Sequence, residues 1–365
     1  MKKIITSILT LAAIVACSKT DVSYEPAKEI SIVPVNENVT KSVMSGTEFV
    51  GENFNLWAWY QETPAGADKI STWQSGFADG ATTLYIDEKP FEERDAAKNL
   101  WGGVVPYFWP KTGSLIFAAY HAPSLTDADD VTYKFDESDN YMSFNGVKET
   151  KLNASGYAED VMYANMTTSS FNSNSNEVSI EFKHALTWIT VTVCKKSNPE
   201  IPAEITMHDV YFTAVDSEGD GKVVNQETVA WTTKGASDNL DVLDKDVVLE
   251  YKITEATETT ERKVESVITT LDEYLIIPQD IEGELKVRYT VESTDKSKFT
   301  ETYTVNLTSL KEGSHNAWLP GKHYTYNLQI GTDELLVSPI VTDWEPIDTS
   351  ILIPLPEVTP GQPGV

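Results

Sequence analysis

Cysteine is almost absent from the sequence: Cys17 and Cys194 are the only two in 365 residues. Cys17 ends an N-terminal export signal, described below, and is predicted there to carry lipid. Cys194 is then left without a partner, so no intramolecular disulfide is expected. An exported chain without disulfides must be held together by its hydrophobic core, and the residues after the signal are numerous enough for two domains of ordinary size.

Arginine and histidine are also scarce. The chain has three arginines, five histidines and a formal net charge of −28. Such an acidic surface repels nucleic acid and anionic lipid, so neither is a credible partner, and three arginines are too few for a phosphate site of any size. The histidines show no metal-ligand spacing such as HExxH. His184 is predicted to be a packed or hydrogen-bonded structural residue. The five are His121, His184, His208, His315 and His323.

Catalytic motifs are missing as well. The sequence contains no G-x-S-x-G elbow, no P-loop and no dinucleotide fingerprint. Its carboxylates are so numerous that no glycosidase pair can be singled out. We therefore predict a protein that is not an enzyme, with no catalytic residue, no cofactor and no metal site.

One acidic stretch resembles a calcium loop. Residues Asp216 to Gly221, followed by Glu227, have the spacing of an EF-hand loop, with Glu218 in place of the usual Asp or Asn. The flanking segments are strand-like rather than helical. An acidic hairpin turn is therefore the favoured interpretation, and a calcium site is the alternative.

Long apolar runs are absent except at the N-terminus. Lys2 and Lys3 precede an apolar run, Ile4 to Val15, which is shorter than the about 20 residues needed to cross a bilayer. The run leads into Ile14-Val15-Ala16-Cys17, which resembles a bacterial lipobox. We predict that residues 1–17 are a lipoprotein signal, that acyl chains such as palmitate on Cys17 anchor the protein in a membrane, and that residues 18–28 are a tether. A plain signal peptide that happens to contain cysteine is the alternative.

Helical patterns are nearly absent too. The segment Asp87 to Leu100 has the only helix-like composition, and it lacks a clean apolar stripe. Elsewhere, runs of β-branched and aromatic residues alternate with turn signals at intervals typical of antiparallel sandwiches. The run FNSNSNE at Phe171 to Glu177 marks a domain boundary. The prediction is an all-β protein with two sandwiches in series, at residues 29–176 and 177–347, and a tail at 348–365.

Tryptophan is plentiful, with nine in the chain. Asn53 to Glu62 is apolar on both faces, which is typical of a central strand covered on both sides. Its Trp57 and Trp59, like Trp188 and Trp344, are predicted to lie in the core. Three others lie in looser surroundings and are candidates for exposed platforms that bind glycans, although structural packing is the favoured interpretation. These three are Trp73, Trp101 and Trp231.

The stretch Glu29 to Phe49 combines a strand with an accessible lysine. Its first half, with Ile30, Ile32, Val33 and Val35 around Pro34, predicts a strand. Lys41 follows among small polar residues, and it is the only basic residue between Lys28 and Lys69. We hypothesise that a trypsin-like protease cuts between Lys41 and Ser42, which makes the first strand detachable. An ordinary strand followed by an exposed loop lysine is the alternative.

Five short motifs, taken in order with the lipobox, resemble the Bacteroidales fimbrillin family, the Mfa-like type V pilin lipoproteins. Each motif alone is short and mostly structural. They are Tyr107-Phe108-Trp109-Pro110 before LIFAAYHAP, FKHAL at Phe182 to Leu186, LIIPQ at Leu275 to Gln279, WLPGKHYTYNLQI at Trp318 to Ile330, and VTDW at Val341 to Trp344.

This resemblance implies a fold and a mode of assembly. It implies two transthyretin-like β-sandwich domains, export as a lipoprotein, removal of the first strand by an Arg- or Lys-specific protease, and a neighbouring subunit that fills the gap. The usual family cut follows a Thr-Arg pair. The matching pair here is Thr40-Lys41, so the enzyme must accept lysine.

The resemblance also implies partners and a location. The partners are other pilin subunits (copies of this chain or paralogues), the maturation protease, and outer-membrane lipid through Cys17. The location is a fimbria on the outer membrane, at the cell surface. The rival function is that of a surface lipoprotein or pilus-tip adhesin that does not polymerise and binds glycan or protein.

The C-terminal tail contains the candidate donor strand, where Ile351, Ile353 and Leu355 alternate. Pro354 and Pro356 have the same parity, so both missing amides lie on one edge of such a strand. The segment can pair fully along one edge but not along two. It is either a donor strand or an edge strand that covers its own domain, and the Pro- and Gly-rich residues after it are typical of a disordered end.

A Cys17→Ser substitution tests the lipid anchor. Each buried methylene of an acyl chain contributes about 0.8 kcal/mol to membrane binding. We therefore expect the wild-type protein to enter the detergent phase of a Triton X-114 extraction and the variant to stay in the aqueous phase. Cys194→Ser is the matched control and should partition like the wild type. Recovery of the Cys17 variant in the detergent phase would contradict the assignment.

Overall fold

The computed structural model describes residues 27–36, 53–61, 82–135, 140–152, 160–170, 176–196, 203–224, 228–234, 238–254, 263–309, 316–332 and 334–343. These residues form strands and two short 3-10 turns, η2 (Ala96–Lys98) and η3 (Leu307–Ser309). Within these ranges no helix is long and apolar enough to cross a membrane. The all-β prediction is confirmed.

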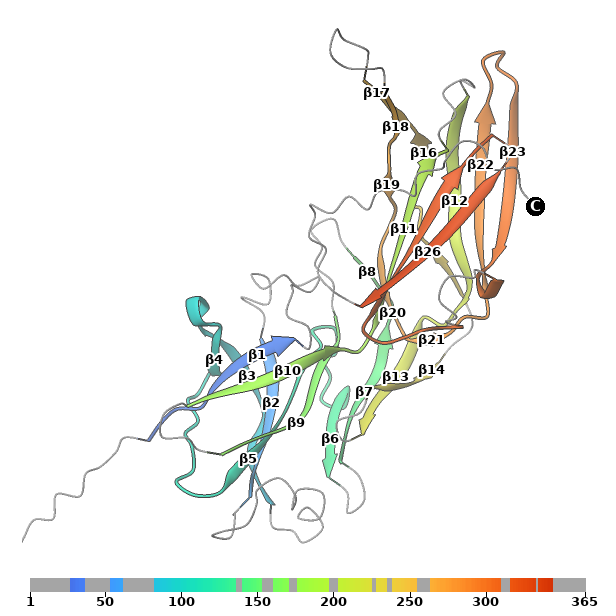
Figure 1. Ribbon diagram of the computed structural model, residues 1–365. Coiled ribbons are helices and arrows are strands. Elements are labelled where there is room, and N and C mark those ends of the chain that lie inside the picture. Colours follow the sequence, from blue (N-terminus) through green and yellow to red (C-terminus); the bar gives the residue numbers. More distant parts are fainter. Residues whose placement is uncertain are drawn as a thin grey trace, which may run out of the picture.

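Seven strands close into a barrel in the N-terminal half, in the order β1-β10-β9-β5-β2-β3-β4 (Figure 1). β1 is parallel to β10, and the other pairs are antiparallel. The two facing sheets of the predicted sandwich are here a closed barrel, because β1 joins the two end strands β10 and β4. The bounds are β1 Ser31–Asn36, β2 Phe54–Gln61, β3 Thr82–Asp95, β4 Leu100–Gly103, β5 Ser114–His121, β9 Met162–Ser170 and β10 Glu177–His184.

Strand β2 is the doubly covered central strand that its sequence predicted, since it lies between β3 and β5. Phe54 and Leu56 point into the barrel, where the Phe54 ring lies 5.4 Å from the Trp101 ring and 5.3 Å from the Phe182 ring. Trp57 and Trp59 alternate with them and pack in a second core outside the barrel. Because successive side chains of a strand point to opposite faces, one face of β2 contributes to the barrel core and the other to the second core.

A four-stranded sheet, in the order β14-β13-β7-β6, contributes to that second core. β6 and β7 come before residue 176 and β13 and β14 after it, whereas β10, also after it, belongs to the barrel. Strand pairing thus crosses the predicted boundary, and the division into domains at that position stays a prediction. The bounds are β6 Val131–Phe135, β7 Asn140–Lys148, β13 Glu218–Val224 and β14 Ala230–Thr233.

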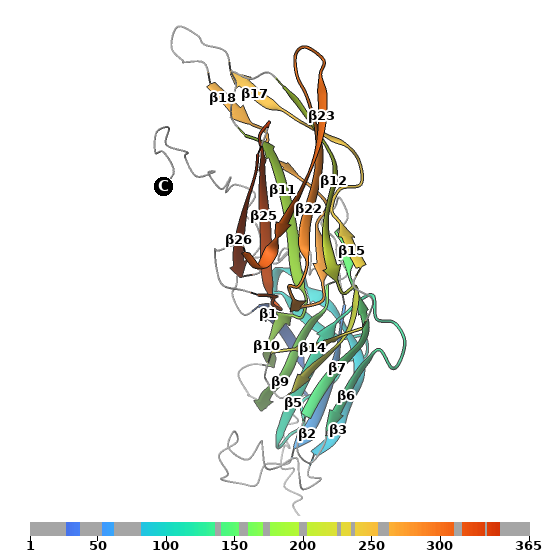
Figure 2. The same ribbon diagram turned by 90° about the vertical axis from the view of Figure 1, so that its right-hand side faces the viewer.

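Two larger sheets enclose a third core in the C-terminal half (Figure 2). One has the order β26-β25-β11-β20-β8 with β19 beside β11, and the other has the order β15-β12-β22-β23 with β16 beside β12. In β22 alternate residues, Leu285, Val287, Tyr289 and Val291, are buried, which is the pattern of a strand with one face on the core.

The bounds of these strands complete the fold. The first sheet has β8 Thr150–Lys151, β11 Thr187–Lys195, β19 Thr269–Thr270, β20 Tyr274–Ile276, β25 Lys322–Ile330 and β26 Leu335–Asp343. The second has β12 Glu204–Val215, β15 Asp238–Asp241, β16 Val247–Leu249, β22 Glu284–Glu292 and β23 Lys298–Asn306. Two short ladders pair β17 Tyr251–Thr254 with β18 Lys263–Ser266, and β21 Gln279–Asp280 with β24 Ala317–Trp318.

The helix-like interpretation of Asp87 to Leu100 is wrong, since β3 continues to Asp95 and only the three residues of η2 are helical. Pairing with β2 on one side and β4 on the other outweighs the local composition. Phe91 is fully buried in the barrel. Glu88 has a φ of 45° beside a register shift between β2 and β3, so the strand accommodates its irregularity there.

Two of the five motifs, FKHAL and WLPGKHYTYNLQI, meet where the barrel joins the C-terminal half. The amide of Gly321 donates to the Leu186 carbonyl at 2.8 Å, and the Thr187 hydroxyl donates to the Leu319 carbonyl at 2.8 Å. Gly321 has a φ of +68°, which glycine adopts at no steric cost. His184 lies 2.7 Å from Asp160 through Nδ1 and Oδ2, which confirms its structural role.

His323 in β25 makes the stability of the fold depend on pH. Its ring stacks on Trp188 with centroids 3.8 Å apart, and burial lowers its pKa to about 4. The unfolded chain, with a histidine pKa near 6.5, binds an additional proton between about pH 4 and 6.5. Stability from this group is therefore complete above about pH 6.5 and is lost as the pH falls towards 4, by about 3 kcal/mol.

A His323→Gln variant tests this dependence. We expect the difference in unfolding free energy between pH 7.5 and pH 4.5, measured by urea denaturation, to shrink by about 2–3 kcal/mol. His208→Gln, which replaces a more exposed histidine outside the Trp188 stack, is the matched control for the substitution itself. Equal pH dependence in all three proteins would rule out His323 as the source.

Candidate functional site

The candidate site is the seat of β1 in the barrel wall. Ile30 and Ile32 are 1% and 0% exposed, and Pro34 is also buried. The strand is in parallel register with β10 from Ser31 opposite Glu177 to Asn36 opposite Phe182. These inward side chains place the first strand of the chain in the same core as Phe54 and Trp101.

The two edges of β1 are held very differently. The edge towards β10 pairs over its full length, whereas the edge towards β4 has one pair, Ile32 opposite Trp101. The Asn99 side chain replaces part of the missing ladder, since its Nδ2 donates to the Pro34 carbonyl at 3.0 Å. Pro34 itself has no backbone N–H and so cannot donate a hydrogen bond on that edge. β1 is therefore joined fully to one neighbour and weakly to the other.

Loop residues clamp the start of the strand. The Ile30 amide donates to the Tyr107 carbonyl at 2.8 Å, and the Trp109 amide donates to the Lys28 carbonyl at 2.9 Å. The YFWP motif thus holds the residues that precede β1. On the other side, Asn176 donates through Nδ2 to the Glu29 carbonyl at 2.8 Å. The sequence does not indicate this role for Asn176, because it shows the residue only as part of an Asn-Ser run.

Loss of β1 would leave a specific defect. Two fully buried isoleucines contribute about 1.5–3 kcal/mol each, and a domain is typically stable by about 5–15 kcal/mol. The barrel would open between β10 and β4, with the edge of β10 unpaired and the Trp101 and Phe182 rings uncovered on one side. An extended segment with apolar residues at every second position can repair both the ladder and the core.

The predicted processing, lipidation and donor residues lie outside the described residues. β1 ends at Asn36, and the next described residue is Asn53. The structure therefore brings Ile30, Ile32 and Pro34 together with the loop residues that hold the strand. The roles of the remaining site residues stay predictions, and these residues are Cys17, Lys41, Ser42, Ile351, Ile353 and Leu355.

The tryptophans separate into core and surface. Trp57, Trp59 and Trp188 are buried, as predicted. Trp101 is fully buried, which agrees with the favoured packing interpretation and rules out the alternative of an exposed platform at this residue. Its position between β3 and β1 in the barrel was not visible locally. Trp231 is partly exposed. Trp73 and Trp344 lie outside the described residues.

The hairpin interpretation of the acidic stretch is wrong: Asp216 and Ser217 connect β12 to β13, which lie in different sheets and do not pair, and Glu218 to Gly221 belong to β13. Asp220 already has partners: its Oδ1 accepts from the Gly146 amide at 2.9 Å and its Oδ2 pairs with Lys234 at 2.6 Å. Glu227 lies outside the described residues. Among the residues that the structure does describe, no group of three or more His, Cys, Asp or Glu side chains is arranged to hold a metal ion.

Comparisons with known proteins add family and fold. The family model described as fimbrillin-like matches residues 58–344. A fimbrial protein from Bacteroides vulgatus is 16% identical, with a TM-score of 0.56 over 87% of this chain and 99% of that one. A candidate cell adhesion protein from Bacteroides uniformis is 14% identical, with a TM-score of 0.48 over 87% and 98%. No curated protein matches the chain. At these identities the likeness to the first structure shows the fold alone.

An Ile32→Ala substitution tests the contribution of β1 to stability. Truncation of a fully buried isoleucine typically costs about 2–5 kcal/mol, and we expect a loss in that range by urea denaturation. Val33→Ala changes a neighbour on the opposite face that is only partly buried, and its loss should be less than half as large. If the two losses were equal, Ile32 would not be the inward anchor of the strand.

Proposed function

Because this chain belongs to the fimbrillin-like family, a family of cell-surface proteins, we propose that it is a structural subunit of a fimbria. In this proposal the subunit is exported as a lipoprotein through Cys17, cut after Lys41, and assembled with other pilin subunits by strand exchange at the seat of β1. The observation that carries it is the one-sided attachment of β1 in a barrel that it closes.

The connection of β1 to the rest of the chain supports a cut at Lys41. β1 neighbours β10 and β4, whereas β2 neighbours β3 and β5. The two strands that flank Lys41 in the sequence are therefore not paired with each other. A cut between them breaks the covalent link. Because β1 and β2 are not paired, the cut disrupts no hydrogen bond between them, and only noncovalent contacts then hold β1 in the barrel.

The hydrogen-bonding parity of β1 supports one orientation for the incoming strand. Ile32 and Pro34 point inward, and their backbone groups face β4: Ile32 pairs with Trp101, and the Pro34 carbonyl accepts from Asn99. Ser31 lies between them in alternation, and its amide donates to the Asn176 carbonyl beside β10. In a strand that runs like β1, residues with inward side chains therefore direct their backbone groups to β4. Reversing the strand directs those groups to β10 instead.

The tail fits the reversed orientation. If Ile351, Ile353 and Leu355 point inward like Ile30 and Ile32, a strand parallel to β10 would direct Pro354 and Pro356 at the β10 ladder, where an amide is needed. In the antiparallel orientation both prolines face β4, where β1 itself makes a single pair. We propose that the tail of a neighbouring subunit enters the seat antiparallel to β10.

The rival function is a monomeric surface protein or tip adhesin. It requires β1 to stay in place throughout, with residues 18–41 retained in the mature protein. The seat of β1 favours the structural subunit, because the rival gives no role to a strand that closes the barrel through one full ladder and one isolated pair.

A Lys41→Ala substitution tests processing and assembly together. Digestion of the wild-type chain with a Lys-specific protease should release the N-terminal segment, and the remainder should form oligomers in size-exclusion chromatography. The Lys41 variant should remain uncut at that position and monomeric, because β1 still fills its seat. Lys69→Ala, which changes the next lysine along the chain, is the matched control and should assemble like the wild type.

Two outcomes would contradict the proposal. A mature form taken from cells that retains residues 18–41 would exclude processing. Oligomers of equal size from the Lys41 variant would exclude release of β1 as the trigger of assembly.

Removal of residues 351–365 from the processed chain should abolish assembly while leaving the monomer able to accept a tail peptide added in solution.

A further inference from the structure

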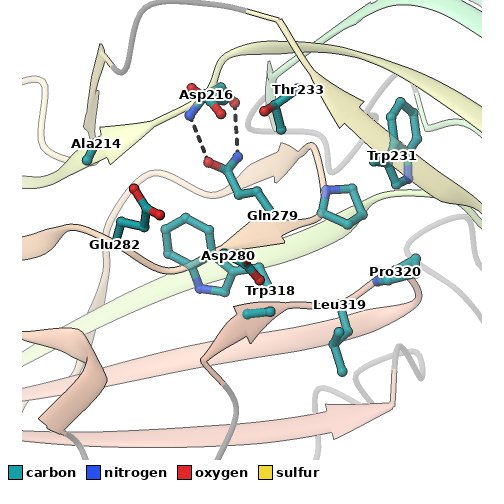
Figure 3. Close-up of a pocket in the computed structure, with 12 residues that line it drawn as sticks. Ala214, Asp216, Trp231, Thr233, Gln279, Asp280, Glu282, Trp318, Leu319 and Pro320 are labelled. Atoms are coloured by element: carbon teal, nitrogen blue, oxygen red, sulfur yellow. Dashed lines mark hydrogen bonds between the residues drawn. The ribbon is translucent and has the colours of Figure 1, made fainter.

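A cleft with no assigned role lies between the end of β12, strand β14 and the short ladder of β21 and β24 (Figure 3). Its volume is about 420 Å³, within the range of about 300–1,000 Å³ that is usual for small-molecule pockets. The turn after β12 and strand β14 form one wall, and β21 and β24 form the floor and the other wall. The lining residues used below are Asp216, Trp231, Gln279, Asp280, Glu282 and Leu319.

The walls of the cleft are rigid. Gln279 accepts from the Asp216 amide at 2.8 Å and donates to the Asp216 carbonyl at 3.0 Å, so its side chain ties the two walls together. Trp231 donates through Nε1 to the Ala185 carbonyl at 2.8 Å. Its ring lies over Gly221, where an added Cβ would come within 3.0 Å of the indole. The cleft is therefore formed before any ligand arrives.

Apart from the Thr233 hydroxyl, the side-chain donors of the cleft are already used. The amide of Gln279 and the indole N–H of Trp231 bond to backbone carbonyls, and Trp318 donates through Nε1 to the Tyr326 hydroxyl at 2.9 Å. The lining contains no basic side chain. The charged groups of the lining are all acceptors, the carboxylates of Asp216, Asp280 and Glu282.

These carboxylates differ from others on this surface. Many acidic residues of the described chain pair with lysine or arginine, as Asp220 does with Lys234. Asp216, Asp280 and Glu282 make no ion pair with any residue that the structure describes. Three unneutralised carboxylates around one cavity repel anions. A ligand must bring hydrogen-bond donors and no negative charge.

The remaining lining is apolar and partly aromatic. Of the tryptophans that the structure describes, only Trp231 is not buried. Its ring, together with Pro320 and the exposed Leu319, offers surface for C–H groups. A neutral sugar combines hydroxyl donors with a C–H face and so matches both halves of this lining.

We propose that the cleft is a binding site for a neutral oligosaccharide that spans it, with one sugar face on Trp231 at one end and hydroxyls of other units donating to Asp280 and Glu282 towards the opposite end (Figure 3). A lysine- or arginine-rich peptide would also find the carboxylates, but Asp280 and Glu282 are exposed, where a charge pair contributes little. No lining residue belongs to β1. The proposal is therefore independent of strand exchange and of the structural role proposed above.

The test uses the intact mature chain and a panel of neutral oligosaccharides (maltotriose, cellotriose, chitotriose and lacto-N-tetraose), with binding measured by calorimetry and by tryptophan fluorescence. We expect at least one to bind at submillimolar concentration. Trp231→Ala should weaken that binding at least tenfold. The double variant Asp280→Asn, Glu282→Gln should weaken it at least threefold, and because both positions are exposed it should fold like the wild type.

Glu301→Gln is the matched control: it removes one exposed carboxylate on β23, outside the cleft, and binding should stay within twofold of the wild type. Failure of every sugar to bind at 10 mM would overturn the proposal. Binding that is unchanged in both cleft variants would also overturn it. A lysine-rich peptide that binds more tightly than every sugar, with the same sensitivity to the double variant, would replace the saccharide with a cationic partner.

Discussion

The parallel pairing of β1 with β10 is the constraint on which the N-terminal half depends. It brings the first strand of the chain against a strand that begins at Glu177, and it places Ile30 and Ile32 in a core built by Phe54, Trp101 and Phe182. Without that ladder the barrel has two open edges and an uncovered aromatic core. A strand that contributes so much yet is attached mainly on one side suits a subunit completed by its neighbour.

The second core spans the junction of the two halves. Strand β2 supplies the barrel core with one face and the second core with the other. The second core also contains Leu275 and Ile277 from the C-terminal half, and hydrogen bonds between Leu186 and Gly321 and between Thr187 and Leu319 cross nearby. This junction fixes the walls of the acidic cleft, because Trp231 is anchored to Ala185 and Gln279 to Asp216.

The seat of β1 and the cleft differ in chemistry. The seat is apolar inside and offers a backbone ladder, which suits an extended chain with alternating apolar residues. The cleft offers carboxylates and an indole ring, which suit the donor-rich ligand proposed for it. Because no lining residue of the cleft belongs to β1, a subunit can exchange its first strand and keep the cleft. Assembly and ligand binding are therefore compatible in one molecule.

Local periodicity in the sequence was enough to predict an all-β chain, the strand at β1, the doubly covered β2 and the burial of Trp57 and Trp59, because those features depend on neighbours two positions apart. Only the tertiary structure decided that β3 replaces a helix-like segment, that Trp101 is buried, and that Asn176 clamps a strand 147 positions earlier. The closed barrel and the cleft likewise depend on contacts between segments that are far apart in the sequence. Pairing between distant segments outweighs local propensity, and no pattern within one stretch of sequence records which segment the partner will be.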